Sequence, residues 1–364
     1  MKENGKIEKK QHLRRILTLI SMIFAAFGLL CMILCAINPL ISPDSFVLTS
    51  FFGLTFWPIL FYNILLLIVL IVLKAKWKII ISGVAILIAI PGFTRSFSFG
   101  PKNDETGNIK ILSYNVGNYW DITDNQRERK DVKNDVIEII KSQNPDIVCL
   151  QESSGWNEKL ATAFAEQIDC PYYGYNKGSN NVIFSKYPLE IDEFTDNADI
   201  NNVGLVRKVN VDDLGQFYIE CVHLQSFMIT KEEIEYLHDA GNYVENSETM
   251  GKSLLNKLKE GFIKRTSDTK TIVENLPDDA PIVVCGDFND TPLSYTYHQM
   301  RKAGFTDAFL KVDSGIGRTY CGRLPMLRID YFWCSDNIVP MTFDRVTRKL
   351  SDHYPIIMTF NVTH

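Results

Sequence analysis

Two long stretches without a charged residue dominate the beginning of this chain. They cover residues 16–43 and 45–73, and each exceeds the roughly 20 residues that a helix needs to cross the hydrocarbon core of a membrane. Buried helices of a soluble core would keep a charged or polar face, which these stretches lack. A third uncharged stretch, residues 79–94, is near the lower limit of about 17 residues. We therefore predict an N-terminal membrane region, residues 1–94, with three spans at about 16–38, 51–73 and 79–94.

A cleaved signal peptide is the alternative for the first stretch, because a basic segment precedes it. The stretch is too long for a signal peptide, and two further apolar stretches follow it. Multiple spans are therefore the better interpretation, with the lipid bilayer as the partner of these helices.

The placement of Lys and Arg predicts the orientation of the spans. Residues 1–15 and the loop 74–78 are rich in Lys and Arg, whereas the loop 38–50 has neither. The positive-inside rule places the two basic segments in the cytoplasm. A third span then carries the rest of the chain across, so we predict a multi-pass protein of the cytoplasmic (inner) membrane with its soluble domain on the periplasmic side. With two spans, the domain would be cytoplasmic.

The rest of the chain has the composition of a water-soluble, acidic domain. Up to residue 107 there are eleven Lys and Arg against five Asp and Glu, and beyond it there are 27 against 38. Gly and Pro among polar residues indicate a linker at 95–108. An acidic domain without a basic, aromatic-rich loop does not attract a polyanion by its general field, which argues against a dedicated nucleic-acid-binding protein.

Residues 109–364 alternate strand-like and helix-like segments. Short apolar runs between turn-forming residues predict strands at 109–114, 146–150, 181–184, 203–211, 217–224, 281–285, 328–334 and 354–362. Apolar residues at helical spacing predict helices at 127–143, at 156–168 and within 232–271. Strands that follow helices and also follow each other favour a mixed α/β sandwich over a purely parallel sheet.

Polar residues gather at the ends of these strands, where ligands bind in layered α/β folds. They are Asn115, Glu152, His223, Asp287 with Asn289, Asp330, and Asp352 with His353. Each has an ordinary alternative when taken alone, such as a turn-forming Asn or a satisfied core histidine. Asp330 is harder to dismiss, because a carboxylate within so apolar a strand needs a partner.

Six short motifs around these residues resemble, in the same order, those of the endonuclease/exonuclease/phosphatase superfamily of divalent-metal phosphohydrolases. They are Ser113–Val116 (SYNV), Leu150–Glu152 (LQE), Val222–Leu224 (VHL), Gly286–Asn289 (GDFN), Arg328–Tyr331 (RIDY) and Ser351–Pro355 (SDHYP). The resemblance covers about residues 109–360 and implies an α/β fold with four layers, an α/β/β/α sandwich of two mixed sheets, for a catalytic domain at 109–364. The membrane region lies outside it.

The resemblance also implies which residues bind metal. Glu152 would be the main metal carboxylate, with Asn115 beside it and Asp352 as a further ligand. The implied cofactor is Mg²⁺, with Mn²⁺ as the alternative. Mg²⁺ needs few protein carboxylates, because it keeps several waters and takes substrate phosphate as a ligand.

The same resemblance assigns catalytic roles. Asp287 would orient or deprotonate the attacking water, and Asn289 would bind a phosphate oxygen. His353, held by Asp330, would face the scissile phosphate, and His223 would be the second histidine there.

One position departs from the family pattern. Many members have an Arg where this chain has Lys186, which keeps the charge but loses the forked geometry of a guanidinium. We expect Lys186 to contact substrate.

Together these features predict a membrane-anchored, metal-dependent hydrolase of phosphate mono- or diesters. The substrate stays open among nucleic acid, a phospholipid headgroup and a small phosphate ester, and no protein partner is evident. The alternative is a catalytically inactive, membrane-tethered binding or sensing domain on the same fold. A degenerate domain would be expected to lose Glu152, the Asp287/Asn289 pair or His353, and all of them are present.

Overall fold

The computed structural model describes residues 2–103, 105–124, 126–176, 180–212, 214–227, 247–277, 280–322 and 327–363. The chain divides into two compact units. One comprises Met1–Arg95 with Pro292–Tyr295, and the other comprises Ser96–Thr291 and Thr296–His364. Much of the segment 225–247, which is acidic in sequence, and the beginning of the predicted helical segment 232–271 lie outside the described residues.

The first unit is helical, and its described surface is largely apolar. Its elements are α1 (Lys2–Ile37), the short η1 (Asn38–Leu40), α2 (Pro43–Phe46), α3 (Leu48–Leu54), α4 (Phe56–Val72) and α5 (Lys76–Ser96). The side chains of Leu19, Phe27, Leu65 and Leu87 are more than half exposed. Such surfaces suit contact with lipid.

Two helices, Ile16–Leu40 and Lys76–Ser96, are long and apolar enough to cross a membrane. The helices α3 and α4 form a third candidate only if they count together, since they meet at a bend of 71°. The backbone leaves the helical region at Thr55 (ψ 15°), and Pro58 follows in the first turn of α4, where its missing N–H costs no helical hydrogen bond. The described residues thus offer two or three spans, and the predicted span at 51–73 is broken at Thr55.

Polar side chains join the helices of this unit. Asn63 on α4 is fully buried and donates from Nδ2 to the carbonyl of Gly28 on α1 (3.2 Å). Gly28 has no side chain to hold the helices apart. Lys78 on α5 donates from Nζ to the hydroxyl of Ser21 (2.8 Å). Small residues and interhelical hydrogen bonds of this kind are typical of helix packing in membranes.

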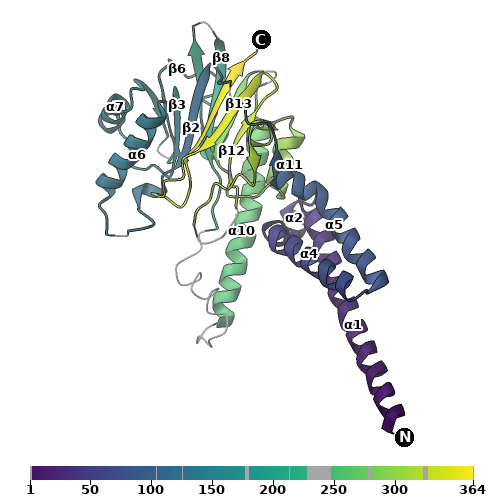
Figure 1. Cartoon of the computed structure of the whole chain (residues 1–364). Coiled ribbons are helices and arrows are strands. Elements are labelled where there is room, and N and C mark those ends of the chain that lie inside the picture. The colour runs from purple at the N-terminus through teal and green to yellow at the C-terminus, as the bar shows by residue number, and fades with distance from the viewer. Residues whose placement is uncertain are drawn as a thin grey trace. The chain divides into compact units, whose positions relative to one another are not determined.

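The second unit is built on two six-stranded mixed sheets (Figure 1). One has the order β13-β14-β2-β3-β5-β4, with β2 (Ile109–Asn115), β3 (Ile147–Gln151), β4 (Tyr172–Tyr175), β5 (Val182–Ser185), β13 (Ile338–Arg345) and β14 (Ile356–Val362). The other has the order β10-β12-β9-β8-β7-β6, with β6 (Leu189–Glu190), β7 (Gly204–Val211), β8 (Gly215–His223), β9 (Ile282–Asp287), β10 (Thr306–Asp307) and β12 (Asp330–Cys334). A separate pair joins β1 (Ser98–Phe99) to β11 (Ser314–Gly315).

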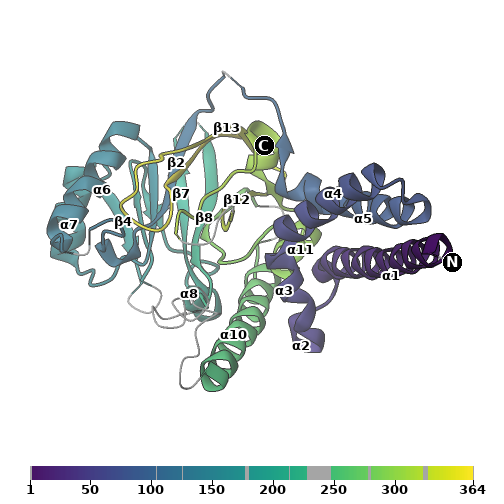
Figure 2. The same ribbon diagram turned by 60° about the horizontal axis from the view of Figure 1, so that its bottom comes forward.

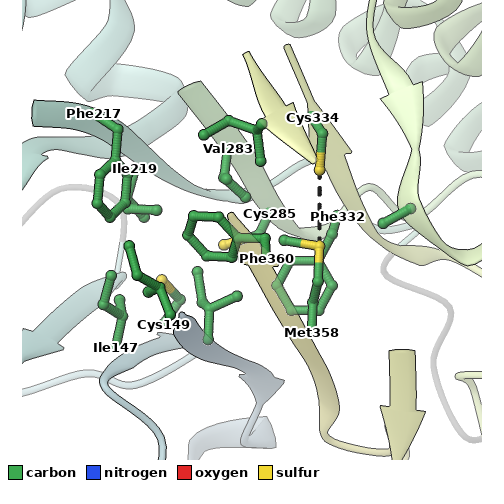
Figure 3. Close-up of a cluster of buried hydrophobic side chains, with 14 of the residues drawn as sticks. Ile147, Cys149, Phe217, Ile219, Val283, Cys285, Phe332, Cys334, Met358 and Phe360 are labelled. Atoms are coloured by element: carbon green, nitrogen blue, oxygen red, sulfur yellow. Dashed lines mark hydrogen bonds between the residues drawn. The ribbon is translucent and has the colours of Figure 1, made fainter. Parts of the chain in front are cut away.

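The inner faces of the two sheets form one apolar core (Figure 3). Phe217 and Phe360 meet edge to face within it, at 5.5 Å between ring centroids. Three cysteines, Cys149, Cys221 and Cys285, lie there as buried free thiols. They pack there as small hydrophobic residues.

Helices cover the outer face of each sheet (Figure 2). The first sheet is covered by α6 (Arg129–Gln143) and α7 (Glu158–Gln167), which bury Val136, Ile140 and Phe164 against it. The second is covered by α10 (Ser247–Glu274) and α11 (Tyr295–Lys302), with the short α8 (Ala198–Val203) beside them. The short α12 (Ala308–Val312) instead packs into the apolar core between the sheets. The four layers of the α/β/β/α sandwich are therefore confirmed.

Candidate active site

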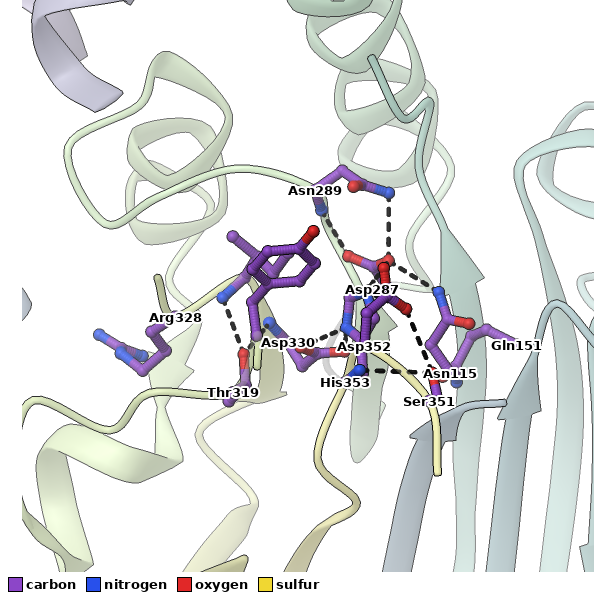
Figure 4. Close-up of polar contacts among 12 residues, drawn as sticks. Asn115, Gln151, Asp287, Asn289, Thr319, Arg328, Asp330, Ser351, Asp352 and His353 are labelled. Atoms are coloured by element: carbon purple, nitrogen blue, oxygen red, sulfur yellow. Dashed lines mark hydrogen bonds and ion pairs between the residues drawn. The ribbon is translucent and has the colours of Figure 1, made fainter. Parts of the chain in front are cut away.

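The strand register brings the polar strand ends together. The parallel pair β2 and β3 places Asn115 opposite Gln151, and the parallel pair β8 and β9 places His223 opposite Asp287. On antiparallel β12, Asp330 also lies opposite Asp287. Side chains from both sheets therefore meet at one edge of the sandwich (Figure 4).

Asp287 lies at the centre of this cluster. Its buried carboxylate accepts hydrogen bonds from the backbone N–H of Asn289 (2.8 Å) and from the amide nitrogens of Asn289 (3.1 Å) and Asn115 (3.0 Å). The Nε2 atoms of His353 and His223 lie 3.5 and 3.7 Å from its Oδ2. Burial raises the pKa of Asp287, although both histidines oppose that shift. This carboxylate is placed to exchange a proton with a small polar ligand.

His353 and Asp330 form a buried dyad beside it. The ring Nδ1 lies 2.9 Å from Asp330 Oδ2, which fixes the orientation of the imidazole. Burial alone would lower the pKa of His353, but the carboxylates of Asp330 and Asp287 outweigh burial and hold it well above its usual value. The Thr319 hydroxyl supports the dyad by accepting a hydrogen bond from the backbone N–H of Asp330 (3.1 Å). The imidazole is therefore arranged to carry a proton and face an anion.

Glu152 follows β3 directly and has a left-handed backbone (φ 49°). Its carboxylate accepts hydrogen bonds from Asn115 Nδ2 (3.0 Å) and Asn118 Nδ2 (3.4 Å), and His223 Nε2 lies 3.4 Å away. About a third of its side chain is exposed. The amide oxygen of Asn115 accepts the N–H of Gly117 (3.0 Å), so Asn115 presents its nitrogen to the carboxylates.

The remaining predicted residues divide into two groups. Asp352 borders the cluster: its Oδ1 lies 4.0 Å from His353 Nε2 and its side chain is 41% exposed. Lys186 does not join it. Lys186 follows β5 at the end where Ser185 pairs with Ile147, the first residue of β3, and its Nζ binds Asp146 (3.1 Å) and Asn144 (2.9 Å). The substrate contact expected of Lys186 is corrected accordingly, because β5 runs antiparallel to β3 and ends at the opposite edge.

Two residues at the site were missed by sequence reasoning. Asn118 binds Glu152 through its side chain, and its backbone N–H donates to the Glu152 carbonyl (2.9 Å). The Gly117-Asn118 pair, which begins two residues after Asn115, was an available turn signal, but it did not reveal the contact. Thr319 lies in a segment without a recognisable motif.

The donor set fits a divalent cation. Among the described residues, Asp287, Asp330 and His353 have ligand atoms close enough together to hold a metal. None of the predicted ligands Glu152, Asn115 and Asp352 belongs to this set. Two of its members, Asp330 and His353, already bind each other in the dyad. Glu152 and Asp352 are more exposed carboxylates at the same cluster, and their oxygens are the hard donors that Mg²⁺ prefers.

Buried carboxylates, a carboxylate-held histidine and amides at the edge of an α/β/β/α sandwich define a class of phosphoester hydrolases. The chain belongs to the Endonuclease/Exonuclease/phosphatase family, whose model matches residues 112–353. Residues 14–96 match a separate model, described as a domain of unknown function.

Individual proteins are more distantly similar. "Uncharacterized protein YbhP" of Escherichia coli (strain K12) is 24% identical over 295 residues, which cover 73% of this chain and 98% of that protein. "Recombination repair protein 1" of Drosophila melanogaster is 24% identical over 73% of this chain, but only 39% of that protein is covered. Among solved structures, an endonuclease/exonuclease/phosphatase from Bacteroides vulgatus has a TM-score of 0.47 at 16% identity, over 70% of this chain and 98% of that one. The human Nocturnin catalytic domain has a TM-score of 0.44 at 18% identity, over 72% and 96%.

Proposed function

We propose that this chain is a membrane-anchored, divalent-metal-dependent hydrolase that cleaves phosphate mono- or diesters by attack of water. The observation that carries the proposal is the convergence on Asp287 of two histidines and two amide side chains, beside the Asp330–His353 dyad. Phosphoester hydrolysis needs a positioned water, donors for the phosphate oxygens and charge that stabilises the leaving oxygen. The cluster supplies a candidate group for each need.

Each residue then has a distinct role. Asp287 holds and deprotonates the water, because its buried carboxylate is a better proton acceptor than an exposed one. His353 and His223 face the phosphate oxygens, and Asp330 keeps the His353 ring oriented and favours its protonated form. Asn289 contributes to phosphate binding.

Glu152 and Asp352 would hold Mg²⁺ or Mn²⁺, and Asn115 would orient the Glu152 carboxylate through its amide nitrogen. When bound, such a cation neutralises charge on the phosphate oxygens and on the leaving oxygen. The substrate class, whether nucleic acid, phospholipid headgroup or small ester, is not specified by these residues. The apolar helices would tether the enzyme to the cytoplasmic membrane, with the catalytic domain on the periplasmic side.

An assay panel on the full-length chain in detergent tests this function. Plasmid DNA, RNA, bis-p-nitrophenyl phosphate, sphingomyelin and inositol phosphates would be offered with Mg²⁺, Mn²⁺ or a chelator. We expect metal-dependent release from at least one ester, abolished by His353→Ala and retained by the exposed control Glu166→Gln. A folded protein that hydrolyses none of them would favour the inactive binding or sensing domain.

A further inference from the structure

The helix α10 carries an arginine that is buried beside the site. The side chain of Arg265 has no exposed surface, although the neighbouring Lys264 on the same helix is 59% exposed. A guanidinium is rarely buried without partners, because the loss of hydration has to be offset. The partners of Arg265 therefore indicate what it is for.

Its polar partners belong to two different segments. Arg265 Nε lies 3.3 Å from Asp290 Oδ2, and its Nη1 donates to the carbonyl of Gln225 (2.8 Å). The rings of Phe227 and Phe262 lie against the guanidinium, with centroids 4.2 and 5.0 Å from Cζ. One guanidinium thus joins the segment that leaves β8 to the segment that leaves β9.

Both segments carry residues of the site. Gln225 comes two residues after His223, and Asp290 comes directly after Asn289. The same segments are joined on the site side, where Asn289 Nδ2 donates to the Leu224 carbonyl (2.9 Å) and the Leu224 N–H donates to the Asp287 carbonyl (2.9 Å). Through these two segments, Arg265 therefore constrains the spacing of His223, Asp287 and Asn289.

A purely stabilising role accounts for this arrangement poorly. Burying an ion pair contributes little net stability, since apolar residues of similar volume often serve as well. An Arg is needed where one planar group must bind two acceptors in fixed directions, which a Lys cannot do. Asp290 is itself almost fully buried, and its backbone carbonyl accepts a hydrogen bond from Tyr331 (2.8 Å).

We propose that Arg265 is a positioning residue for phosphoester cleavage, acting through Asp290 and the Gln225 carbonyl to hold Asn289 and His223 against Asp287. This inference rests on the proposed function of the site. It concerns a residue on a helix whose described side chains are not part of the cluster itself.

The test compares variants of the full-length chain in detergent. Arg265→Met should lower kcat/KM on bis-p-nitrophenyl phosphate by roughly 10- to 100-fold, since small displacements of catalytic groups cost about that much. The kcat/KM of Arg265→Lys should lie between those of Arg265→Met and the wild type. Lys270→Met, at an exposed position on the same helix, serves as the control and should match the wild type.

A second variant separates positioning from folding. Arg265→Met with Asp290→Asn removes both charges, so its melting temperature should recover towards that of the wild type while kcat/KM stays low. Binding of inorganic phosphate with Mg²⁺, followed by calorimetry, should weaken in the same variants. Recovery of turnover together with melting temperature, or an Arg265→Met enzyme within twofold of the wild type, would overturn the inference. A wild type that neither cleaves esters nor binds phosphate would overturn the proposed function, and this inference with it.

Discussion

The site differs from an ordinary polar turn in how deeply its charged residues are buried. Asp287, Asp330 and His353 are each at most 5% exposed at the side chain, yet each has a defined partner. Charged residues are almost never this buried unless they are paired, and such groups are enriched at functional sites. Burial and pairing together favour catalysis over a structural turn.

Changing Asp330 tests the dyad directly. In Asp330→Asn the amide can no longer favour the protonated His353 or fix its tautomer, so we expect turnover to fall by roughly 10²- to 10⁴-fold. Affinity for Mg²⁺ should change far less, because the proposed ligands are Glu152 and Asp352. Steady-state kinetics and a calorimetric metal titration measure the two effects. Equal losses in both would instead make Asp330 a metal ligand.

Glu220 offers a pH-dependent test away from the site. Burial raises its pKa to about 8, and its Oε1 has no hydrogen-bond partner among the described residues. In the unfolded chain a Glu side chain has a pKa of about 4.3, so the folded protein binds the Glu220 proton more tightly than the unfolded chain does. The stability that this proton contributes is fully present below about pH 4.3 and is lost as the pH rises through about 8. The free energy of unfolding falls by up to about 1.4 kcal/mol per pH unit over this range.

The free energy of unfolding of Glu220→Gln should therefore lack this pH dependence. Relative to the wild type, the variant should become more stable as the pH rises from 5.5 to 7.5. Urea unfolding of the full chain in detergent, followed by tryptophan fluorescence at several pH values, measures the difference. The exposed Glu166→Gln should parallel the wild type. A constant difference between Glu220→Gln and the wild type across this range would mean that Glu220 is not protonated in the fold.

Site residues could be predicted where a short local motif in the sequence contains them. Glu152, Asp287 and His353 are in short motifs that follow apolar strands, so their meeting required only the sheet topology. The contacts of Asn118 and Arg265 depend on a left-handed turn and on the docking of a distant helix. No sequence spacing encodes those two contacts.

At the scale of elements, one glycine controls the alignment of β8 and β9. Gly286 has a φ of 132° and lies opposite Val222, and a Cβ there would overlap the Val222 carbonyl oxygen. Gly286→Ala should therefore destabilise the protein by more than about 3 kcal/mol, combining backbone strain with overpacking. Gly304→Ala is the control, since Gly304 also has a positive φ (93°) but faces open space, and it should cost about 1 kcal/mol. Thermal unfolding of both variants checks the contrast, and equal losses would contradict it.

The predicted strands all exist, with ends within two residues of their expected positions. Strands such as β3 and β9 are buried along their whole length, and their nearly continuous apolar runs make the signal strong. The eight-residue edge strand β13 was not predicted, and neither were shorter pieces such as β6, β10 and α8. A two-residue strand such as β6 has no periodicity to detect, and the pairing of β6 with β7 is decided by tertiary contacts.

At the scale of the whole molecule, the uncharged stretches predicted apolar helices, but not the break at Thr55. Hydropathy averages over a window, so it detects the apolar content of α3 and α4 without the 71° bend between them. The side on which the catalytic domain lies depends on whether this pair spans the membrane.

Cysteine labelling in intact Escherichia coli spheroplasts can decide between the two topologies. All eight native cysteines are buried, so background labelling by an impermeant maleimide should be low. Lys159→Cys reports on the exposed surface of the catalytic domain, and Lys74→Cys reports on the loop before α5. Three spans require Lys159→Cys to react in intact spheroplasts and Lys74→Cys to react only after permeabilisation, because the basic loop stays in the cytoplasm. Protection of Lys159→Cys until permeabilisation would place the catalytic domain in the cytoplasm, with α3 and α4 lying at the membrane surface and not across it.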